Sequence, residues 1–455
     1  MKTLKKQWLE VLSIYQYVLC FVFLGPVFSL LGVFLLFTSL WCFSLLYLVW
    51  LFLDWDTPLQ GGRRYQWLKN CTVWKHLSDY FPIKAISGGR KGLVTETRKA
   101  SSIQSGTLLA EGEHLGVSTA LLPSPTMKIL QKQQLEVLST YKYVSCFLFM
   151  GPFFSLLGVF LLFTSLWWLS VLYTVWLFLD WDTPCQGGRR SQWIRNWVLW
   201  KHMRDYFPIK LIKTAELPSN RNYVLATHPH GILSVGVFCN FCTEVTGSSQ
   251  QFPGLRFSLA ILNSLFYLPV YRDYVMSYGT CSVNHQSLDF ILSQPQLGQA
   301  VLILVGGAHE ALHAVPGEHC LTLRNCKGFV RLALRHGTSL VPVYSFGEND
   351  IFRVKAFAPD SWQHLFQVTI KKVVGISPCV FWGRGLFSDK SCGLVPLARP
   401  ITTVVGRPIP VPQCPQPTEE QVDHYHTLYM KALEQLFEEH KESCGLPASA
   451  RLTFI

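Results

Sequence analysis

Two long stretches without a charged residue dominate the hydrophobic pattern of the chain, Gln16–Leu53 and Tyr143–Leu179. One membrane span needs about 20 apolar residues, and two spans need about 40. Each stretch carries a Gly-Pro pair, Gly25-Pro26 in the first and Gly151-Pro152 in the second, which favours a bend. The pattern therefore predicts a short apolar helical hairpin in each stretch.

Basic residues flank both stretches on either side. Because positive charge stays on the cytoplasmic side of a membrane, both ends of each stretch should lie in the cytosol. Each stretch then makes an even number of crossings or dips into the bilayer and returns. The flanking residues are Lys2, Lys5, Lys6, Arg63, Arg64, Lys69 and Lys75 around the first stretch, and Lys128, Lys132, Lys142, Arg189, Arg190, Arg195 and Lys201 around the second.

The two stretches belong to an internal repeat. Residues 1–84 and 127–210 have nearly the same sequence, without a gap; for example, Ser29–Trp41 returns as Ser155–Trp167. Two such similar copies do not make a solenoid, so we interpret them as a duplicated amino-terminal segment. Residues 85–126 between the copies are rich in Gly, Ser and Thr and predict a flexible linker.

From residue 211 to 455, short apolar runs alternate with amphipathic segments, which is typical of an α/β domain with its own core. A capping box at Thr418–Gln421 marks the start of the last helix. Its expected buried face is Val422, Tyr425, Tyr429, Leu433, Leu436 and Phe437. The expected strands are Tyr223–Thr227, Ala300–Val305, Ser339–Tyr344 and Ile401–Gly406, and Gly328–Arg335 is expected to be helical.

Composition narrows the class of protein. Of the 455 residues 49% are hydrophobic and 15% charged, against roughly 25% charged in an ordinary soluble protein. These values exclude a disordered chain and disfavour a fully soluble one. The net charge of +12 suits a membrane surface or a phosphate-bearing substrate, and no nucleic-acid-binding motif accompanies it. The 14 scattered cysteines indicate a reducing compartment.

The first candidate for chemistry is His228-Pro229-His230-Gly231, directly after an expected strand. Pro229 favours an extended His228, and Gly231 frees the backbone beside His230. An imidazole has a pKa near 6.5, which suits it to take a proton from an alcohol at neutral pH. The alternatives are two polar turn histidines or half of a metal site.

The second candidate is His309-Glu310-Ala-Leu-His313, which matches the H-E-x-x-H motif of zinc proteases. Glycines before it and a Pro-Gly pair after it leave about two helical turns, and no third ligand is evident. We therefore favour a polar turn with Glu310 as the functional group. Cys239 and Cys242 form a lone CxxC pair and are expected to be buried small hydrophobes.

A third segment is basic. Arg324, Lys327 and Arg331 surround Gly328 at the expected start of a helix. Such a segment can bind phosphate groups through its side chains and the helix N-terminus. The alternative is a solvated basic face.

Several segments, in order along the chain, resemble the diacylglycerol acyltransferase 2 family, which includes monoacylglycerol and wax-alcohol acyltransferases. The resemblance covers the chain from about Leu115 to its end with one hairpin, and the extra amino-terminal copy departs from the family. The matching segments are Tyr206–Pro208, His228–Gly231, Phe252–Arg256, Tyr271–Tyr274, Gly306–Leu312, Arg324–Asp350 and Val404–Pro412.

The resemblance implies a membrane-anchored, glycerolipid-acyltransferase-like α/β domain preceded by the apolar hairpins. It implies acyl transfer from acyl-CoA to the hydroxyl of mono- or diacylglycerol, in a multi-pass protein of the endoplasmic reticulum whose catalytic domain is cytosolic. Acyl-CoA is then a co-substrate, and no cofactor, metal or nucleic acid is expected. Homo- or hetero-oligomers are left open.

Alcohol attack on a thioester needs a base, for which His230 is the candidate, with His228 in support. In related glycerolipid acyltransferases an Asp lies five positions after the histidine. Here those positions hold Leu233 and Val235, so Glu244 and Glu310 are the candidates for an orienting carboxylate.

Alcohol attack on a thioester also needs a site that stabilises the oxyanion and a site that binds the anionic leaving group. Backbone N–H groups at Gly231, Gly306 and Gly307 are candidates for the oxyanion. Arg324, Lys327 and Arg331 are candidates for the CoA phosphates. No G-x-S-x-G motif is present, so direct transfer without an acyl-enzyme is favoured.

Three other interpretations stay open at this point. The acceptor can be a long-chain alcohol, as in the wax-alcohol members of the family. The HEALH segment alone would support a membrane zinc metalloprotease. A membrane anchor or lipid-binding protein without catalytic activity is the third.

Overall fold

The computed structural model describes residues 125–455, except 359–360, 376–377, 387 and 389–390. Residues Ile129–Ile455 form one compact unit. The expected first hairpin copy, residues 1–84, and the expected linker up to residue 124 lie outside the described residues.

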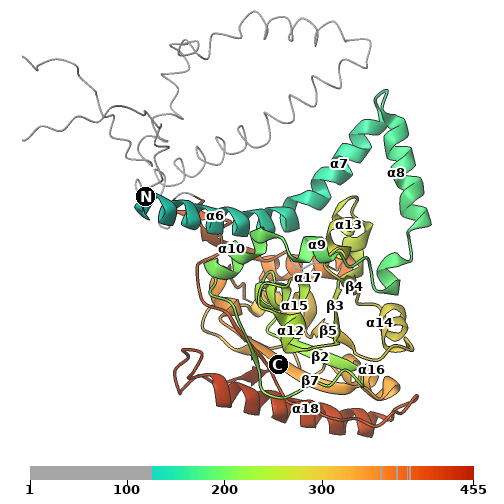
Figure 1. Ribbon diagram of the computed structural model, residues 1–455, viewed down its shortest axis with the longest axis vertical. Helices are drawn as coiled ribbons and strands as arrows, with labels where there is room; N and C mark the ends of the chain where they lie inside the picture. The colour runs from blue at the N-terminus through green and yellow to red at the C-terminus, as the bar shows by residue number, and fades with distance from the viewer. Residues whose placement is uncertain (1–124, 359–360, 376–377, 387, 389–390) are drawn as a thin grey trace, which may run out of the picture. The chain divides into compact units, whose positions relative to one another are not determined.

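The described chain begins with a long helical run. Helix α6 (Pro125–Ser145) continues through a π-helical turn, η2 (Cys146–Met150), into α7 (Gly151–Leu162), and α8 (Trp167–Leu179) returns beside α7 (Figure 1). Among the described helices, the run Lys132–Leu162 is the one long and apolar enough to cross a membrane, judged by length and composition alone. Many large apolar side chains of α7 and α8 are exposed, including Leu156, Phe160, Leu172, Phe178 and Leu179.

The bend of this hairpin lies one helix later than the sequence predicts. Gly151-Pro152 begins α7 directly after the π-helical turn η2, and the chain stays helical there, with Met150 and Gly151 both in the right-handed helical region. The chain reverses after Leu162 instead. There the hydroxyl of Thr164 donates to the Leu161 carbonyl (2.8 Å) and accepts from the N–H of Leu166 (3.1 Å). The reversal predicted at Gly151-Pro152 therefore lies further along the chain, although the helical run changes direction where α6 passes through η2 into α7 (Figure 1).

Seven of the described strands form a mixed sheet in the order β1-β11-β7-β2-β5-β3-β4. The strands from β7 across to β4 are parallel, β11 is antiparallel to β7, and β1 is parallel to β11. All four expected strands are present. The bounds are β1 (Lys210–Lys213), β2 (Tyr223–His228), β3 (Arg256–Ile261), β4 (Thr280–Ser282), β5 (Gln299–Leu304), β7 (Ser339–Phe346) and β11 (Thr402–Val405).

Both faces of the sheet are covered. Alternate residues of β2 point to opposite faces and pack in two different hydrophobic cores. Tyr223 and Leu225 pack with Trp200 and Met203 of α10 (Val198–Tyr206). Val224 and Ala226 pack with residues of α16 (Gly328–His336) and α18 (Glu419–His440). Residues 198–206, at the end of the repeated segment, thus belong to the same core as the sheet.

The last helix has the expected start and nearly the expected face. Thr418 and Gln421 form the capping box. Val422, Tyr429, Leu433, Leu436 and Phe437 are buried, and Tyr425 is half-buried. This helix packs along the second face of the sheet (Figure 1).

Shorter elements connect these parts. Two small sheets lie outside the main one, in the orders β10-β9-β8 and β12-β6. The remaining bounds are η3 (Thr183–Gln186), α9 (Gln192–Arg195), α11 (Val235–Val237), η4 (Phe238–Cys242), α12 (Ser248–Gln251), η5 (Asn263–Tyr267), α13 (Tyr271–Met276), α14 (His285–Leu292), α15 (Gly307–Glu310), η6 (Ala311–His313), β6 (Cys320–Leu321), η7 (Glu348–Ile351), β8 (Arg353–Lys355), α17 (Trp362–Val374), β9 (Val380–Arg384), β10 (Cys392–Gly393) and β12 (Thr453–Phe454).

Candidate active site

Three loops meet at the carboxyl edge of the sheet. They follow β2, β5 and β7, which are adjacent and parallel. In α/β sheets this edge is where ligands bind. The loops carry His230, Glu310 and Glu348, respectively.

His228 ends β2 and is fully buried. Its Nε2 lies 3.0 Å from the hydroxyl of Tyr429 on α18, and that hydroxyl donates to the Ala226 carbonyl (3.0 Å). Because the tyrosine proton is used, His228 must donate from Nε2. Its Nδ1 has no hydrogen-bond partner among the described residues. Burial lowers the pKa of His228 to about 3, so the ring is neutral.

His230 lies two residues further on, after the cis His228-Pro229 bond. Its Nδ1 is 3.0 Å from the Gly231 carbonyl, which can only accept, so Nδ1 carries the proton and Nε2 keeps its lone pair. Burial lowers the pKa of His230 below its usual value, although the bond to Gly231 opposes this. A neutral imidazole with an available Nε2 is the form that a general base requires.

Glu310 joins the loops after β2 and β5. Its carboxylate accepts from the backbone N–H of His230 (2.7 Å) and of Thr322 (3.0 Å). Burial raises the pKa of Glu310 to about 7, against the effect of these two hydrogen bonds. Glu310 therefore fixes the main chain of His230, whereas the Gly231 carbonyl orients its ring.

The positions beside these carboxylates must be glycine, because a Cβ atom there would collide with a glutamate side chain. A Cβ on Gly306 would lie 2.5 Å from a carboxylate oxygen of Glu310, and one on Gly231 would lie 2.7 Å from Cγ of Glu348. Both glycines also have positive φ, +85° and +60°, which disfavours other residues.

Sequence reasoning missed Glu348 as a separate functional residue. Its carboxylate oxygens accept from the N–H groups of Val235 and Gly236 at 2.7 Å each, at the start of α11. Burial raises the pKa of Glu348 to about 7. Glu348 thus ties the loop after β7 to the segment that follows His230. An acidic residue four positions after the expected apolar strand Ser339–Tyr344 was the available signal.

Glu244, the other expected orienting carboxylate, has different partners. Its Oε1 accepts from Arg195 (2.8 Å) and Arg190 (3.3 Å). Arg195 is fully buried and also donates to the carbonyls of Tyr278 and Phe241. Glu244 is therefore committed to these arginines instead of a histidine.

The HEALH segment does not form a long helix. Glu310 ends the four-residue helix α15, and His313 ends the 3₁₀ turn η6. The rings of His309 and His313 are 5.4 Å apart, but both oxygens of Glu310 are turned to backbone N–H groups. Within residues 125–455 as described, no group of three or more His, Cys, Asp or Glu is placed to hold a metal ion. Cys239 and Cys242 are buried in the core, as expected.

The basic segment lies at the start of α16. Phe329 in its first turn packs on Tyr429, with ring centroids 4.8 Å apart, so this turn is next to the residue that holds His228. Arg324 is exposed. Arg331 is paired with Glu419 at 2.6 Å, and Lys327 is paired with Asp423.

The comparisons with known proteins bear on this site. A crystal structure of the 1-acyl-sn-glycerophosphate acyltransferase PlsC from Thermotoga maritima is 11% identical with a TM-score of 0.31, over 68% of this chain and 99% of that chain, which is too distant to inform the fold. Diacylglycerol O-acyltransferase 2 of Homo sapiens is 50% identical over 316 residues, which are 70% of this chain and 81% of that protein. 2-Acylglycerol O-acyltransferase 3 of Homo sapiens is 72% identical over 341 residues, which are 75% of this chain and 100% of that protein. The family model described as diacylglycerol acyltransferase matches residues 33–96 and 159–455, and the chain therefore belongs to the diacylglycerol acyltransferase family.

Proposed function

We propose that this chain transfers a fatty acyl group from acyl-CoA to a hydroxyl of mono- or diacylglycerol, making di- and triacylglycerol. The observation that carries the proposal is His230, whose Nε2 is available at the carboxyl edge of the sheet. The names of the relatives, 2-acylglycerol and diacylglycerol O-acyltransferases, support the substrate class.

In the proposed reaction the acceptor hydroxyl gives its proton to Nε2 of His230 while its oxygen attacks the thioester carbonyl carbon. The tetrahedral intermediate then collapses, the C–S bond breaks, and CoA leaves as a thiol that takes the proton from His230. The acyl group passes directly to the acceptor, so no serine or cysteine nucleophile is required.

The oxyanion of that intermediate needs backbone donors. The N–H of His230 is already bound to Glu310 and that of Gly306 to the thiol of Cys326, which leaves the N–H groups of Gly231 and Gly307 as the candidates. His228 supports the site by holding the end of β2 against Tyr429.

An acceptor panel tests the proposed function. Microsomes that contain the full chain are given labelled oleoyl-CoA with monoacylglycerol, diacylglycerol or a long-chain alcohol. We expect transfer to the acylglycerols. Transfer to the alcohol alone would instead identify a wax-alcohol acyltransferase, and the absence of any acyl ester would leave a membrane anchor or lipid-binding protein.

Substitutions of Arg331 and of its partner Glu419 on α18 distinguish phosphate binding by the basic segment from a solvated basic face. If Arg331 binds a CoA phosphate, Arg331→Ala should raise the KM for acyl-CoA at least tenfold, since a charge-assisted hydrogen bond contributes about 1.5–3 kcal/mol. Glu419→Ala, which frees the same guanidinium, should leave that KM unchanged or lower it. If both variants keep the wild-type KM, Arg331 belongs to a solvated face and its exposed pair contributes about 0–1 kcal/mol.

We place the hairpin in the endoplasmic reticulum membrane, with both of its ends and the sheet domain in the cytosol. The run Lys132–Leu162 is long enough to cross a membrane, but the returning helix α8 has 13 residues and is about 20 Å long, whereas the hydrocarbon core is about 30 Å thick. These lengths favour a hairpin that dips into the bilayer and returns. A carboxy-terminal tag should be digested by protease in sealed microsomes, and its protection would contradict this orientation.

Removal of residues 1–114 should leave most of the activity. The 341-residue alignment already covers the whole human 2-acylglycerol O-acyltransferase 3, and residues 127–210 supply a complete hairpin segment. We therefore expect the shortened chain to enter membranes and to transfer acyl groups at a rate near that of the full chain. A well-expressed, membrane-bound but inactive shortened chain would show that the first copy is needed.

A further inference from the structure

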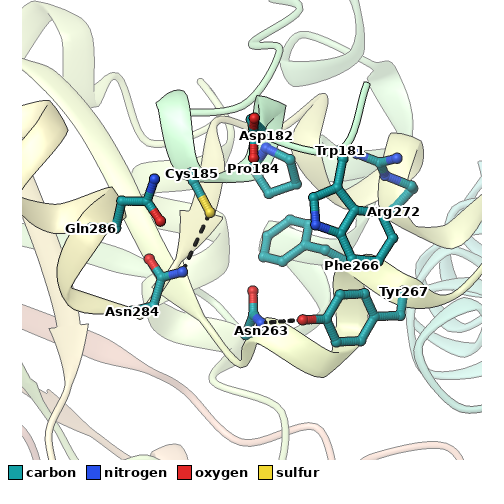
Figure 2. A pocket seen from close by; sticks show the side chains of 10 residues that line it. All are labelled: Trp181, Asp182, Pro184, Cys185, Asn263, Phe266, Tyr267, Arg272, Asn284 and Gln286. Carbon is teal, nitrogen blue, oxygen red and sulfur yellow. Dashed lines mark hydrogen bonds between the residues drawn. The ribbon is translucent and has the colours of Figure 1, made fainter. Parts of the chain in front are cut away.

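A cavity of about 130 Å³ lies at the base of the hairpin, and its lining includes none of the residues used above. Its walls come from the turn after α8, the loop after β3 and the start of α14 after β4 (Figure 2). Strand β3 is two positions from β2 in the sheet, and neighbouring strands are about 4.8 Å apart. The cavity therefore lies at the same sheet edge as His230, two strand positions away at β3 and three at β4.

One wall of the cavity is lined by amide side chains (Figure 2). Asn263 donates to the hydroxyl of Tyr267 (2.6 Å), and Asn284 donates to the thiol of Cys185 (3.3 Å). Each amide group has two N–H donors, so both asparagines keep one for a ligand. Gln286 has no side-chain hydrogen bond to any described residue. This wall can thus bind several hydroxyl groups at once.

The opposite wall is aromatic and continues onto the hairpin. Trp181 stacks on Tyr267 with centroids 5.3 Å apart, and Phe178 of α8 stacks on Trp181 at 6.2 Å. All three rings are half or more exposed. Together they make an apolar path from the exposed surface of α8 to the polar wall, as an acyl chain attached to a polar headgroup would need.

The charges around the cavity disfavour an ionic headgroup. Arg272 is buried and donates to the Asp180 carbonyl (2.7 Å), and its guanidinium lies 3.1 Å from the Asp180 carboxylate. Its charge is therefore neutralised. Asp182 is exposed without a side-chain hydrogen bond to any described residue, and it repels phosphate. Because Trp181 and Tyr267 stack on each other, they do not form an open cage for a quaternary ammonium group.

We infer that this cavity is a docking site for the neutral glyceryl headgroup of the acyl acceptor, held before the acceptor moves along the sheet edge to His230. The inference rests on the proposed function and names the feature of the acceptor that is recognised. The volume fits a headgroup alone, since cavities that enclose a drug-sized ligand measure about 300–1,000 Å³.

Acceptor kinetics test this docking site. Gln286→Ala and Asp182→Ala should each raise the KM for 2-monooleoylglycerol about two- to tenfold, the effect of one lost hydrogen bond. The kcat, the KM for oleoyl-CoA and the KM for oleyl alcohol, which lacks a glyceryl group, should stay at wild-type values. Gln296→Ala removes an exposed amide outside the cavity and is the matched control. An unchanged KM for monooleoylglycerol, or an equal rise for both acceptors, would overturn the inference.

A second measurement does not depend on turnover. Cys185 lines the cavity, whereas Cys392 is exposed elsewhere, so maleimide labelling of the two thiols can be compared by mass spectrometry. Monooleoylglycerol in detergent micelles should protect Cys185 and not Cys392, and Gln286→Ala should weaken the protection. Oleyl alcohol and lysophosphatidylcholine should protect Cys185 much less.

The outcomes keep the two proposals apart. Protection of Cys185 in a chain that transfers acyl groups to no acceptor would refute the proposed function and support a glyceride-binding site. Transfer to monooleoylglycerol without protection would support the function and refute the docking site. Equal protection by all three lipids would show a general lipid-binding surface and would also refute it.

Discussion

Turnover is expected to fall roughly 10²- to 10⁴-fold in His230→Ala, the usual contribution of a general base. The reason is that Nδ1 of His230 is engaged by the Gly231 carbonyl and Nε2 is left for the acceptor. In the proposed mechanism the imidazole acts on the acceptor hydroxyl, so the KM for acyl-CoA should change little. Initial rates with labelled oleoyl-CoA, normalised to the amount of protein in the membrane, measure both quantities.

Two further measurements separate a base from a structural residue. Because burial lowers the pKa of His230, the neutral form persists to lower pH, and the acid limb of kcat/KM should have its midpoint below 6.5. His309→Ala and His313→Ala should keep activity, since no step uses them. Full turnover in His230→Ala, with an inactive His309→Ala that has lost bound zinc, would favour a metal site at HEALH.

Glu310→Ala is expected to lose both activity and stability. The change leaves two N–H groups unpaired, those of His230 and Thr322, in a place where Glu310 is only 2% exposed. At about 1–3 kcal/mol for each unsatisfied group, the free energy of unfolding should fall by about 2–6 kcal/mol. Loss of the restraint on His230 should lower turnover about 10²-fold, as misplacement by about 1 Å does.

Glu310→Gln provides the matched comparison, because its amide has nearly the same shape and keeps one acceptor oxygen. It should recover part of the stability and part of the turnover. If the effect were only a loss of folded protein, kcat per folded molecule would be normal in Glu310→Ala at low temperature. Wild-type kcat under those conditions would disprove the role of Glu310 in placing His230.

The sheet could be predicted because its strands are buried on both faces. Such strands are nearly continuous apolar runs, as in Ser339–Phe346 of β7, where every residue is buried. The last helix could be predicted because its cap and its apolar spacing are both local signals. The point at which the hairpin reverses could not be predicted, since the Gly-Pro pair lies in a helical run that continues after a π-helical turn.

The site was predictable only in part. The histidine pair is marked by its place after an apolar strand, but the choice between Glu244 and Glu310 depends on which loops meet in space. Glu244 meets Arg195, 49 residues away, and Glu310 meets His230, 80 residues away, and no local pattern encodes either pairing. Tyr429 was expected only as a core residue, although a buried tyrosine hydroxyl usually has a hydrogen-bond partner.

The bond between His228 and Tyr429 has a consequence for biosynthesis. These residues are 201 positions apart, so a growing polypeptide emerges from the ribosome with its apolar hairpin long before α18 exists. The bond between His228 and Tyr429 can therefore form only near the end of translation, after the whole hairpin has been synthesised. Messenger variants that stop before codon 418 would lack α18 and are expected to yield a polypeptide that contains the hairpin but cannot form this bond.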